Sequence, residues 1–446
     1  MFSKRELLRL FWPILVEQTL ATTIGVVNTM MVSGVGEAAI SAVGLVDSLN
    51  NLIMNVFIAL ATGATVVVAQ NVGAGNVKVA SETTNQAFSA CVMLAAVCSL
   101  FMVCLGRPLI AALFPGTEAL VTANAQTYLY YSAGSYPFLA AFSAAAGILR
   151  AGRNTRGPMI ASVVSNLVNV GVGALLIFGL RLGVAGAGVA LVCARMSGAL
   201  LLVWMLRSNV KDVRLTRFTL RFRREILVPV LKIGIPAGID SLIFNGGKLL
   251  VQTFVAALGT TAIAANSIAC SLNSFVMIPG NAICTATATV IGNAVGTGER
   301  EEVRRQMFRL TGYSMVLLTG MVLLFAPFVT PFLGLYSPTP EALTLARNVT
   351  YLTLVCSPVL WPPAFISHAA LRSAGDAVYV TCVSVGSMWA CRVFCAWLLG
   401  NLLGWGLIGI WVAWCGDWLV RGVFVLGRIL RRGYERHMPH LVRESA

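Results

Sequence analysis

Twelve long apolar runs determine what this 446-residue chain can fold into. A helix needs about 20 mostly apolar residues to cross a bilayer, and runs this long and numerous are not the cores of soluble domains. Charged residues make up 11% of the chain, against about 25% in soluble proteins. The sequence therefore predicts an all-α integral membrane protein with about twelve transmembrane helices. The runs lie near residues 10–33, 45–69, 86–106, 124–149, 158–180, 183–206, 227–256, 266–291, 308–330, 343–371, 377–400 and 404–427.

A formal net charge of +15 raises nucleic acid as a partner, but the positions of the charges favour a membrane explanation. Of the 32 Lys and Arg residues, 25 fall in segments on the side of the N-terminus. Only Arg107, Arg181 and Arg347 fall on the other side, and the remaining four lie within the runs. Cytoplasmic segments are enriched in Lys and Arg. We therefore expect a multi-pass protein of the inner (cytoplasmic) membrane, with both termini cytoplasmic and no nucleic-acid partner.

The chain repeats itself at an offset of 223 residues. Pro13 aligns with Pro236 and Gly36 with Gly259, and further matches extend to Gly75 and Gly298. Each copy holds six runs, an even number, so both copies enter the membrane in the same direction. This predicts two parallel six-helix lobes related by a pseudo-two-fold axis along the membrane normal.

The repeat also predicts the domain organisation. We expect an N-terminal six-helix lobe over 1–206, a basic cytoplasmic linker over 207–226, and a C-terminal lobe with a short basic cytoplasmic tail over 227–446. Transporters built from parallel repeats place the substrate between the halves near the bilayer midplane. The arrangement therefore indicates a carrier with alternating access.

Ionisable residues inside the membrane are costly and mark candidate functional positions. Glu17 follows Pro13 in the first run, and the repeat offset carries it onto Asp240 in the seventh. Both halves thus place a carboxylate at the same position. Asn28 lies eleven residues after Glu17, about three helical turns, so these two side chains share a face of the first helix.

The second and eighth runs carry stripes of polar residues that would line a wet cavity. The alternative is that they join neighbouring helices by hydrogen bonds. The stripes comprise Asp47, Asn50, Asn51, Asn55 and Thr62 in the second run and Asn266, Asn273 and Asn281 in the eighth.

Asn245 and Lys248 add polar groups to the seventh run. Lys248 either neutralises a carboxylate, Asp240 or Glu17, or exchanges partners when a proton or a cationic substrate binds. Asp417 and Arg421 are four residues apart and are expected to form a local ion pair.

The sequence offers no motif for a cofactor, a metal or ATP. The eleven Cys residues lie in or beside apolar runs without a CxxC pair, and His368 has no second ligand nearby. No Walker-type lysine motif is present, so transport would be driven by an ion gradient. The pair Pro362-Pro363, and Pro13, Pro137, Pro236 and Pro279, are candidates for helix bends.

Several of these features together resemble the multidrug and toxic compound extrusion (MATE) family, prokaryotic branch, over nearly the whole chain. Pro13, fifteen residues before Asn28, matches the family's helix-bending proline. The resemblance implies an exporter that exchanges organic cations or drug-like compounds for protons or sodium ions by rocking two lobes. The matching motifs are the glycine pairs Gly73/Gly75 and Gly296/Gly298, the turns at Leu149–Gly152 and Leu371–Asp376, and the segment Val27–Ser33.

The chain departs from the family's pattern at its acidic positions. The aspartate of the family's first helix falls on Asn28, and the acidic position four residues after the Asn that matches Asn169 falls on Gly173. The C-lobe acidic positions of sodium-type members fall on Phe244 and Trp361. An Asn cannot carry a proton, so our hypothesis is that Glu17, and secondarily Asp240, carries the coupling proton.

Two other functions were weighed. A lipid or lipid-linked oligosaccharide flippase of the same superfamily would need cationic residues in its cavity, and Lys248, Arg195 and Arg392 form no evident cluster within one half. A membrane enzyme would show Asp-rich or His/Asp groups in its loops, which are short here, so we expect no enzyme. The expected partners are membrane lipids, a small cationic substrate and coupling H⁺ or Na⁺, and the chain is expected to be a monomer.

Overall fold

The computed structural model describes residues 4–113, 118–208, 213–336 and 339–439, and these residues form helices and connecting segments without a β-strand. The predicted tail beyond residue 439 and residues 209–212 of the predicted linker lie outside this description. Contacts divide the described chain into two compact units, an N unit up to Gly238 and a C unit from Ile239 onward. The boundary lies inside one long helix, α8 (Arg224–Ala257).

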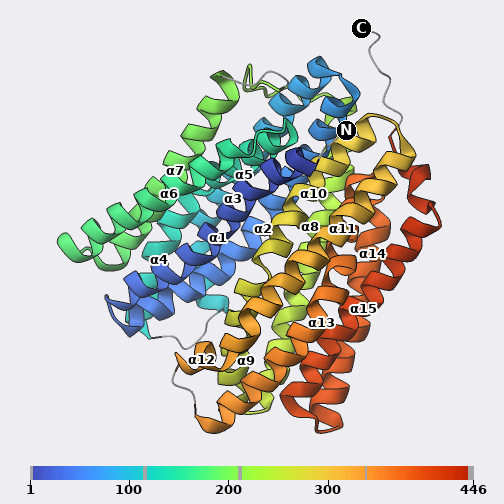
Figure 1. The fold of residues 1–446 in the computed structure, drawn as a ribbon. Helices are drawn as coiled ribbons and strands as arrows, with labels where there is room; N and C mark the ends of the chain where they lie inside the picture. The colour runs from blue at the N-terminus through green and yellow to red at the C-terminus, as the bar shows by residue number, and fades with distance from the viewer. Residues whose placement is uncertain (1–3, 114–117, 209–212, 337–338, 440–446) are drawn as a thin grey trace. The chain divides into compact units, whose positions relative to one another are not determined.

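The N unit holds seven helices and the beginning of α8. Figure 1 shows α6 and α7 running side by side, and these two helices are in extensive contact. The elements are α1 (Lys4–Ser33), α2 (Glu37–Ala74), α3 (Val77–Leu113), α4 (Ala119–Gly134), α5 (Tyr136–Ala151), α6 (Arg156–Ala174) with its continuation η1 (Leu175–Gly179), and α7 (Gly183–Ser208).

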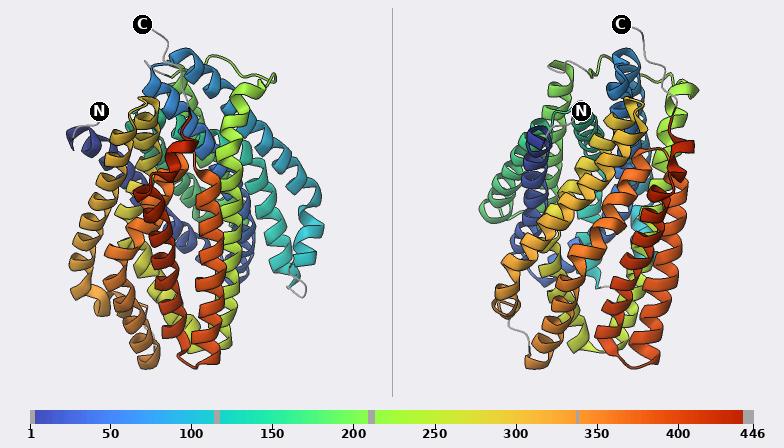
Figure 2. Two further views of the ribbon diagram at one scale, coloured as in Figure 1. Left: turned by 90° about the vertical axis from the view of Figure 1, so that its right-hand side faces the viewer. Right: turned by 45° about the vertical axis from the view of Figure 1, so that its right-hand side comes forward.

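The C unit is built around α13 and α15, which pack against each other along their length (Figure 2). Beyond α8 its elements are α9 (Thr260–Val276), α10 (Ile278–Gly296), α11 (Arg300–Phe325), η2 (Ala326–Phe328), α12 (Val329–Gly334), α13 (Pro340–Ser373), α14 (Ala377–Ser387), η3 (Met388–Phe394), η4 (Trp397–Leu402), α15 (Gly406–Leu430) and η5 (Gly433–His437).

The prediction of about twelve spans is confirmed. Among the described residues, ten helices are long and apolar enough to cross a membrane, and two bent pairs bring the number to twelve. The pair α4–α5 bends by 44° and the pair α9–α10 by 53°. Pro137 and Pro279 stand in the first turn of α5 and α10, directly after these bends. Proline lacks the N–H that a continuing helix would use, so it suits the start of a new helical segment. Pro13, in contrast, lies within an unbroken α1.

The repeated glycines mark equivalent turns in the two halves. Gly36 and Gly259 precede α2 and α9 with φ of 132° and 97°, and Gly75 and Gly298 follow α2 and α10 with φ of 83° and 77°. Side chains with a Cβ rarely adopt these values, so glycine fixes where each span starts and ends.

Close packing of α2 on α8 explains where the contact-based boundary falls. A Cβ added at Gly63 of α2 would overlap the backbone of Val230 and Gly234 on α8. Glycine permits this close approach between helices. The first part of α8 therefore belongs with the N unit by its contacts, while the division at 207–226 stays a prediction drawn from the repeat.

The segment before α8 is fastened to α3 by side-chain amides and a hydroxyl. Asn85 Oδ1 accepts the backbone N–H groups of Thr216 and Arg217 at 2.9 and 3.4 Å, and Asn85 Nδ2 donates to Thr216 Oγ1 at 2.8 Å. Ser89 and Gln86 accept further backbone N–H groups of the segment. These bonds replace the backbone pairing that an extended segment lacks.

Candidate functional site

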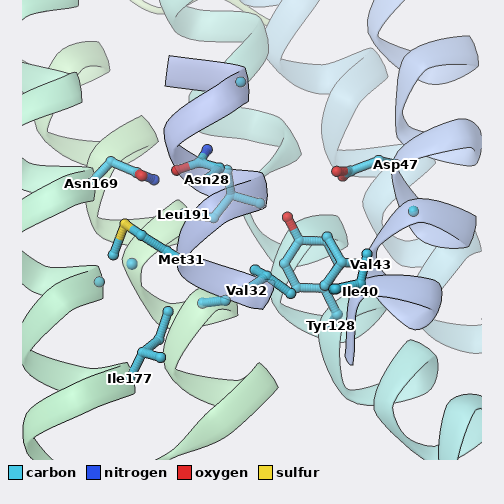
Figure 3. A pocket seen from close by; sticks show the side chains of 15 residues that line it. Asn28, Met31, Val32, Ile40, Val43, Asp47, Tyr128, Asn169, Ile177 and Leu191 are labelled. Carbon is cyan, nitrogen blue, oxygen red and sulfur yellow. The ribbon is translucent and has the colours of Figure 1, made fainter. Parts of the chain in front are cut away.

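The N unit contains a cavity of about 190 Å³ between α1, α2, α4, α6 and α7. Figure 3 shows Asn28 and Asn169 pointing toward one another and Asp47 on the opposite side, with the Tyr128 hydroxyl between them. The structure thus brings together three of the predicted site residues. The lining residues are Gly25, Asn28, Met31, Val32, Ile40, Val43, Gly44, Asp47, Tyr128, Asn169, Gly173, Ile177, Ala187, Ala190 and Leu191.

Asp47 supplies the negative charge of this cavity and is only half-buried. Asn50 Nδ2 donates to Asp47 Oδ1 at 3.2 Å, and Tyr128 also hydrogen-bonds the carboxylate. Arg195 of α7 attracts it electrostatically. Asp47 is therefore positioned by its neighbours while its carboxylate faces the cavity.

Asn50, which donates to Asp47, belongs to a buried hydrogen-bond network. Asn50 Oδ1 accepts the hydroxyl protons of Tyr136 at 2.7 Å and Ser132 at 3.0 Å, and all three side chains are buried. Arg195 Nη1 donates to Ser135 Oγ at 2.6 Å and to the Ser132 carbonyl at 3.5 Å. The Ser132 carbonyl, next to the bend between α4 and α5, also accepts the N–H and the hydroxyl of Ser135 at 3.1 and 2.6 Å, so Arg195 adds a charged donor to a carbonyl that already has partners.

The lining gives this cavity a mixed chemistry. Amide and hydroxyl groups from Asn28, Asn169 and Tyr128 can hydrogen-bond a ligand, and Asp47 can pair with a cation. The rest of the wall is aliphatic or glycine. Convergent polar groups in an otherwise apolar wall are typical of a small-molecule site.

Glu17 is not part of this cavity lining but forms an ion pair with Arg150. Arg150 Nη1 of α5 lies 2.9 Å from both carboxylate oxygens of Glu17 on α1, and the two side chains are 15% and 12% exposed. Glu17 and Asn28 lie on the same helix α1, but Asn28 lines the cavity whereas Glu17 pairs with Arg150.

The C unit contains the repeat-related ion pair. Arg372 Nη2 of α13 donates to Asp240 Oδ2 of α8 at 2.6 Å, and His368 Nε2 lies 3.7 Å from the same oxygen. His368 is buried and its Nε2 also lies 3.2 Å from the Val380 carbonyl. The offset of 223 relates the two carboxylates and an offset of 222 relates the two arginines. Each half therefore carries an equivalent link between its first helix and the helix that ends in the Leu-Arg turn.

The expectation that Lys248 neutralises Asp240 or Glu17 is wrong. Those carboxylates pair with Arg372 and Arg150, whereas the Lys248 ammonium lies 4.9 Å from the centre of the Phe244 ring. A guanidinium matches a carboxylate more closely than an ammonium because its donors form a planar fork.

The other predicted polar residues lie apart from the cavity. Asn51 is exposed, Asn245 Nδ2 bonds the Ser241 carbonyl at 2.7 Å, and Asn273 has a buried Oδ1 without a hydrogen-bond partner. Asn266, in contrast, accepts the indole N–H of Trp411 at 3.0 Å, as expected for a residue that joins helices.

A second charged group in the C unit was missed by the sequence reasoning. The guanidinium carbons of Arg392 and Arg421 lie 5.2 and 5.3 Å from the centre of the Phe244 ring, on which Lys248 also sits. Asp417, fully buried, lies 3.7 Å from Arg392 and 3.4 Å from Arg421. The cationic cluster, which we define as Lys248, Arg392 and Arg421 around Phe244, corrects the expectation that no half gathers positive charge. Arg421 does pair with Asp417, as predicted.

The other site residues that the sequence analysis did not predict make contacts with residues far away along the chain. Arg150, Arg372 and Arg195 were counted only as charges, and Tyr128 was not singled out. A search for repeat-related residues of opposite charge would have found the Arg150 and Arg372 pairings. Among the described residues, no group of three or more His, Cys, Asp or Glu side chains could hold a metal ion.

The apolar spans, the internal repeat and the cavity of the N unit are the features of a multi-pass membrane transporter. A family model described as MatE matches residues 13–175 and 236–398, so it covers most of both halves. The chain belongs to the MatE family, whose members are transporters and not enzymes.

Relatives match this chain over nearly their whole length. An uncharacterized transporter, YisQ, from Bacillus subtilis (strain 168) is 26% identical over 95% of this chain and 93% of its own. A probable multidrug resistance protein NorM from Thermotoga maritima is 26% identical over 97% of this chain and 93% of its own. A solved structure of a multidrug resistance MATE family transporter in an outward-facing conformation has a TM-score of 0.88 at 20% identity, covering 97% of this chain and 96% of its own. That likeness supports the fold.

Proposed function

We propose that this chain exports organic cations or drug-like compounds across the inner membrane, by antiport against protons or sodium ions and with alternating access of its two halves. The observation that carries the proposal is Asp47 facing a cavity that also presents Asn28, Asn169 and Tyr128. Relatives named as probable multidrug resistance proteins support the direction and the class of substrate.

The cavity suits an amphipathic cation. Met31, Val43 and Ile177 provide apolar surface, and Asp47 provides the countercharge. An apolar wall with one charged anchor accepts compounds of different shape, because contact with the wall does not depend on a fixed hydrogen-bond pattern. Such a site is appropriate for a transporter with several substrates.

A binding measurement tests this part of the proposal. We expect ethidium to bind the purified chain, and Asp47→Asn to weaken that binding about tenfold, as expected for loss of one charge-assisted contact. Glu37→Gln removes an exposed carboxylate from the start of the same helix and should leave affinity unchanged. Equal affinity of the wild type and Asp47→Asn would refute the assignment of the cavity.

For the coupling step, we propose that the ion acts on the pairs Glu17–Arg150 and Asp240–Arg372. A proton on either carboxylate would weaken its ion pair and loosen α1 from α5, or α8 from α13. Protonation would therefore change how the first helix of each half packs against its partner helix.

The double variant Glu17→Gln with Asp240→Asn tests the coupling step in proteoliposomes. We expect it to bind ethidium normally but to lose accumulation driven by a pH or sodium gradient. Gradient-driven transport that survives both substitutions would refute a coupling role for these carboxylates.

A second candidate function is a lipid or lipid-linked oligosaccharide flippase. The observation that favours it is the cationic cluster, because a pyrophosphate-linked substrate needs positive charge within the membrane. A flippase would translocate a fluorescent lipid-linked headgroup in proteoliposomes and would not move ethidium.

A further inference from the structure

The C unit holds more positive charge around Phe244 than its carboxylates neutralise. Asp240 is already paired with Arg372 at 2.6 Å. Among the described residues, Asp417 is the carboxylate within ion-pair distance of the cationic cluster, and it serves both Arg392 and Arg421. Its distances of 3.7 and 3.4 Å exceed the 2.7–2.9 Å or so of a strong charge-assisted hydrogen bond. The cluster is therefore under-neutralised.

The three cations also repel one another. Lys248 is repelled by Arg392, and Arg392 by Arg421. Arg421 is only 2% exposed and its Nε has no hydrogen-bond partner. Two of the three cations, Arg392 and Arg421, are buried, and like charges in a low-dielectric interior destabilise the protein unless something of opposite sign accompanies them. This arrangement suits an anion.

Aromatic rings provide the remaining surface of the cluster. The Arg392 guanidinium lies 4.0 Å from the centre of the Trp414 ring, and Arg421 lies 5.1 Å from that of Phe365. Cation–π contacts of this kind hold guanidinium groups without using their N–H donors. The donors stay available for a carboxylate or a phosphate.

The internal repeat places the cluster at the counterpart of the N-unit cavity. Gly25 and Asn169 line that cavity, and the offset of 223 carries them onto Lys248 and Arg392. The two ranges matched by the family model, 13–175 and 236–398, differ by the same 223 residues at both ends. Asp47 maps onto Cys270, which is close enough to Lys248 and Arg392 to interact with both. The region that holds one carboxylate in the N unit thus holds a neutral Cys and two cations in the C unit.

We propose that the cationic cluster of the C unit is a binding site for an organic anion, namely a carboxylate or phosphate attached to an apolar or aromatic body. Lys248 is exposed and is the member that an arriving anion would meet, whereas Arg392 and Arg421 are buried. Phe244 and Trp414, which lie against the cations, make the surroundings of the charge aromatic, and this suits a ligand with an apolar or aromatic body. This site is separate from the N-unit cavity and from the proposed cation export.

The test uses naphthalene-2-carboxylate as the anionic probe and naphthalene-2-carboxamide as its neutral counterpart. Binding to the full chain in uncharged detergent is measured by equilibrium dialysis. We expect the carboxylate to bind at least about tenfold more tightly than the carboxamide. Lys248→Gln should lower this ratio of affinities about tenfold. Lys232→Gln, an exposed lysine on the same helix, is the matched control and should change nothing.

Two further measurements separate the outcomes. Equal binding of the two probes, or a carboxylate preference that Lys248→Gln leaves intact, overturns the proposal. If phosphatidylglycerol competes with the carboxylate in the wild type but not in Lys248→Gln, the site is supported and a lipid phosphate is its anion source. If inorganic phosphate binds in a Lys248-dependent way and the carboxylate does not, the requirement for an aromatic body is overturned. Ethidium binding in Lys248→Gln should equal that of the wild type, so failure here is distinguishable from failure of the export proposal.

Discussion

The ion pair between Glu17 and Arg150 should be measurably important for the stability of the N unit. Both Glu17 oxygens lie 2.9 Å from Arg150 Nη1, and the two side chains are only 12% and 15% exposed. Removing one partner of a buried pair leaves an uncompensated charge and costs about 3–5 kcal/mol. Because some exposure remains, we expect Glu17→Gln to cost about 3 kcal/mol, at the lower end of that range.

A double-mutant cycle separates the pair from other effects of the substitutions. Glu17→Gln, Arg150→Gln and the double variant are unfolded in mixed micelles of increasing sodium dodecyl sulfate, with tryptophan fluorescence as the signal. The double variant should cost less than the sum of the single variants, with a coupling free energy of about 2 kcal/mol. The reason is that the second substitution removes the charge that the first leaves unpaired.

Glu82 and Arg223 provide a matched control in the same unit. They lie 3.4 Å apart, but their side chains are 40% and 66% exposed. Exposed pairs contribute about 0–1 kcal/mol, so Glu82→Gln should have little effect. If Glu17→Gln destabilises the protein no more than Glu82→Gln does, or if the cycle shows no coupling, the structural account of the pair is refuted.

Three further substitutions test other parts of the structure. Asn50→Leu leaves the buried Tyr136 hydroxyl without its Asn50 acceptor, while Ser132 keeps the Leu129 carbonyl, and should destabilise the protein by about 1–3 kcal/mol in the same unfolding assay. Asn273→Leu, whose Oδ1 has no partner, should be near neutral, and equal costs would contradict this. Gly63→Ala should lower the melting temperature because its Cβ meets the α8 backbone, and Gly44→Ala on the same helix should not, since its Cβ meets nothing within 4 Å. Asn85→Ala should release the segment before α8 and speed its cleavage by trypsin, and an unchanged cleavage rate would show that the segment is held by other contacts.

Much of the fold could be predicted from the sequence because each membrane span is a long run of apolar residues that is visible without knowing its neighbours in space. Pro137 and Pro279 stand at the two bends, and the turns fall at glycines that repeat at a fixed offset. Pro236 and the pair Pro362-Pro363, candidates of the same kind, lie within α8 and α13, each a single helix. Of the polar stripe in the second run, Asp47 lines the cavity, whereas Asn50 bonds side chains of neighbouring helices, which was the alternative explanation of the stripe.

The partners of the charged residues could not be predicted in the same way. Arg150 lies 133 residues from Glu17 along the chain, and no local spacing connects them. The cationic cluster joins side chains from α8, η3 and α15, so each member looked isolated in the sequence. For Lys248 the sequence offers Asp240 or Glu17 as a partner, but it does not show the competing guanidinium groups of Arg372 and Arg150.

The most direct test of the account is transport by proteoliposomes under separate pH and sodium gradients, with ethidium as the substrate, for the wild type, Asp47→Asn and the control Glu37→Gln. The account predicts that one gradient drives accumulation by the wild type and by Glu37→Gln, and that Asp47→Asn loses it while unfolding normally. Unchanged transport by Asp47→Asn, or no movement of ethidium by the wild type under either gradient, would contradict it.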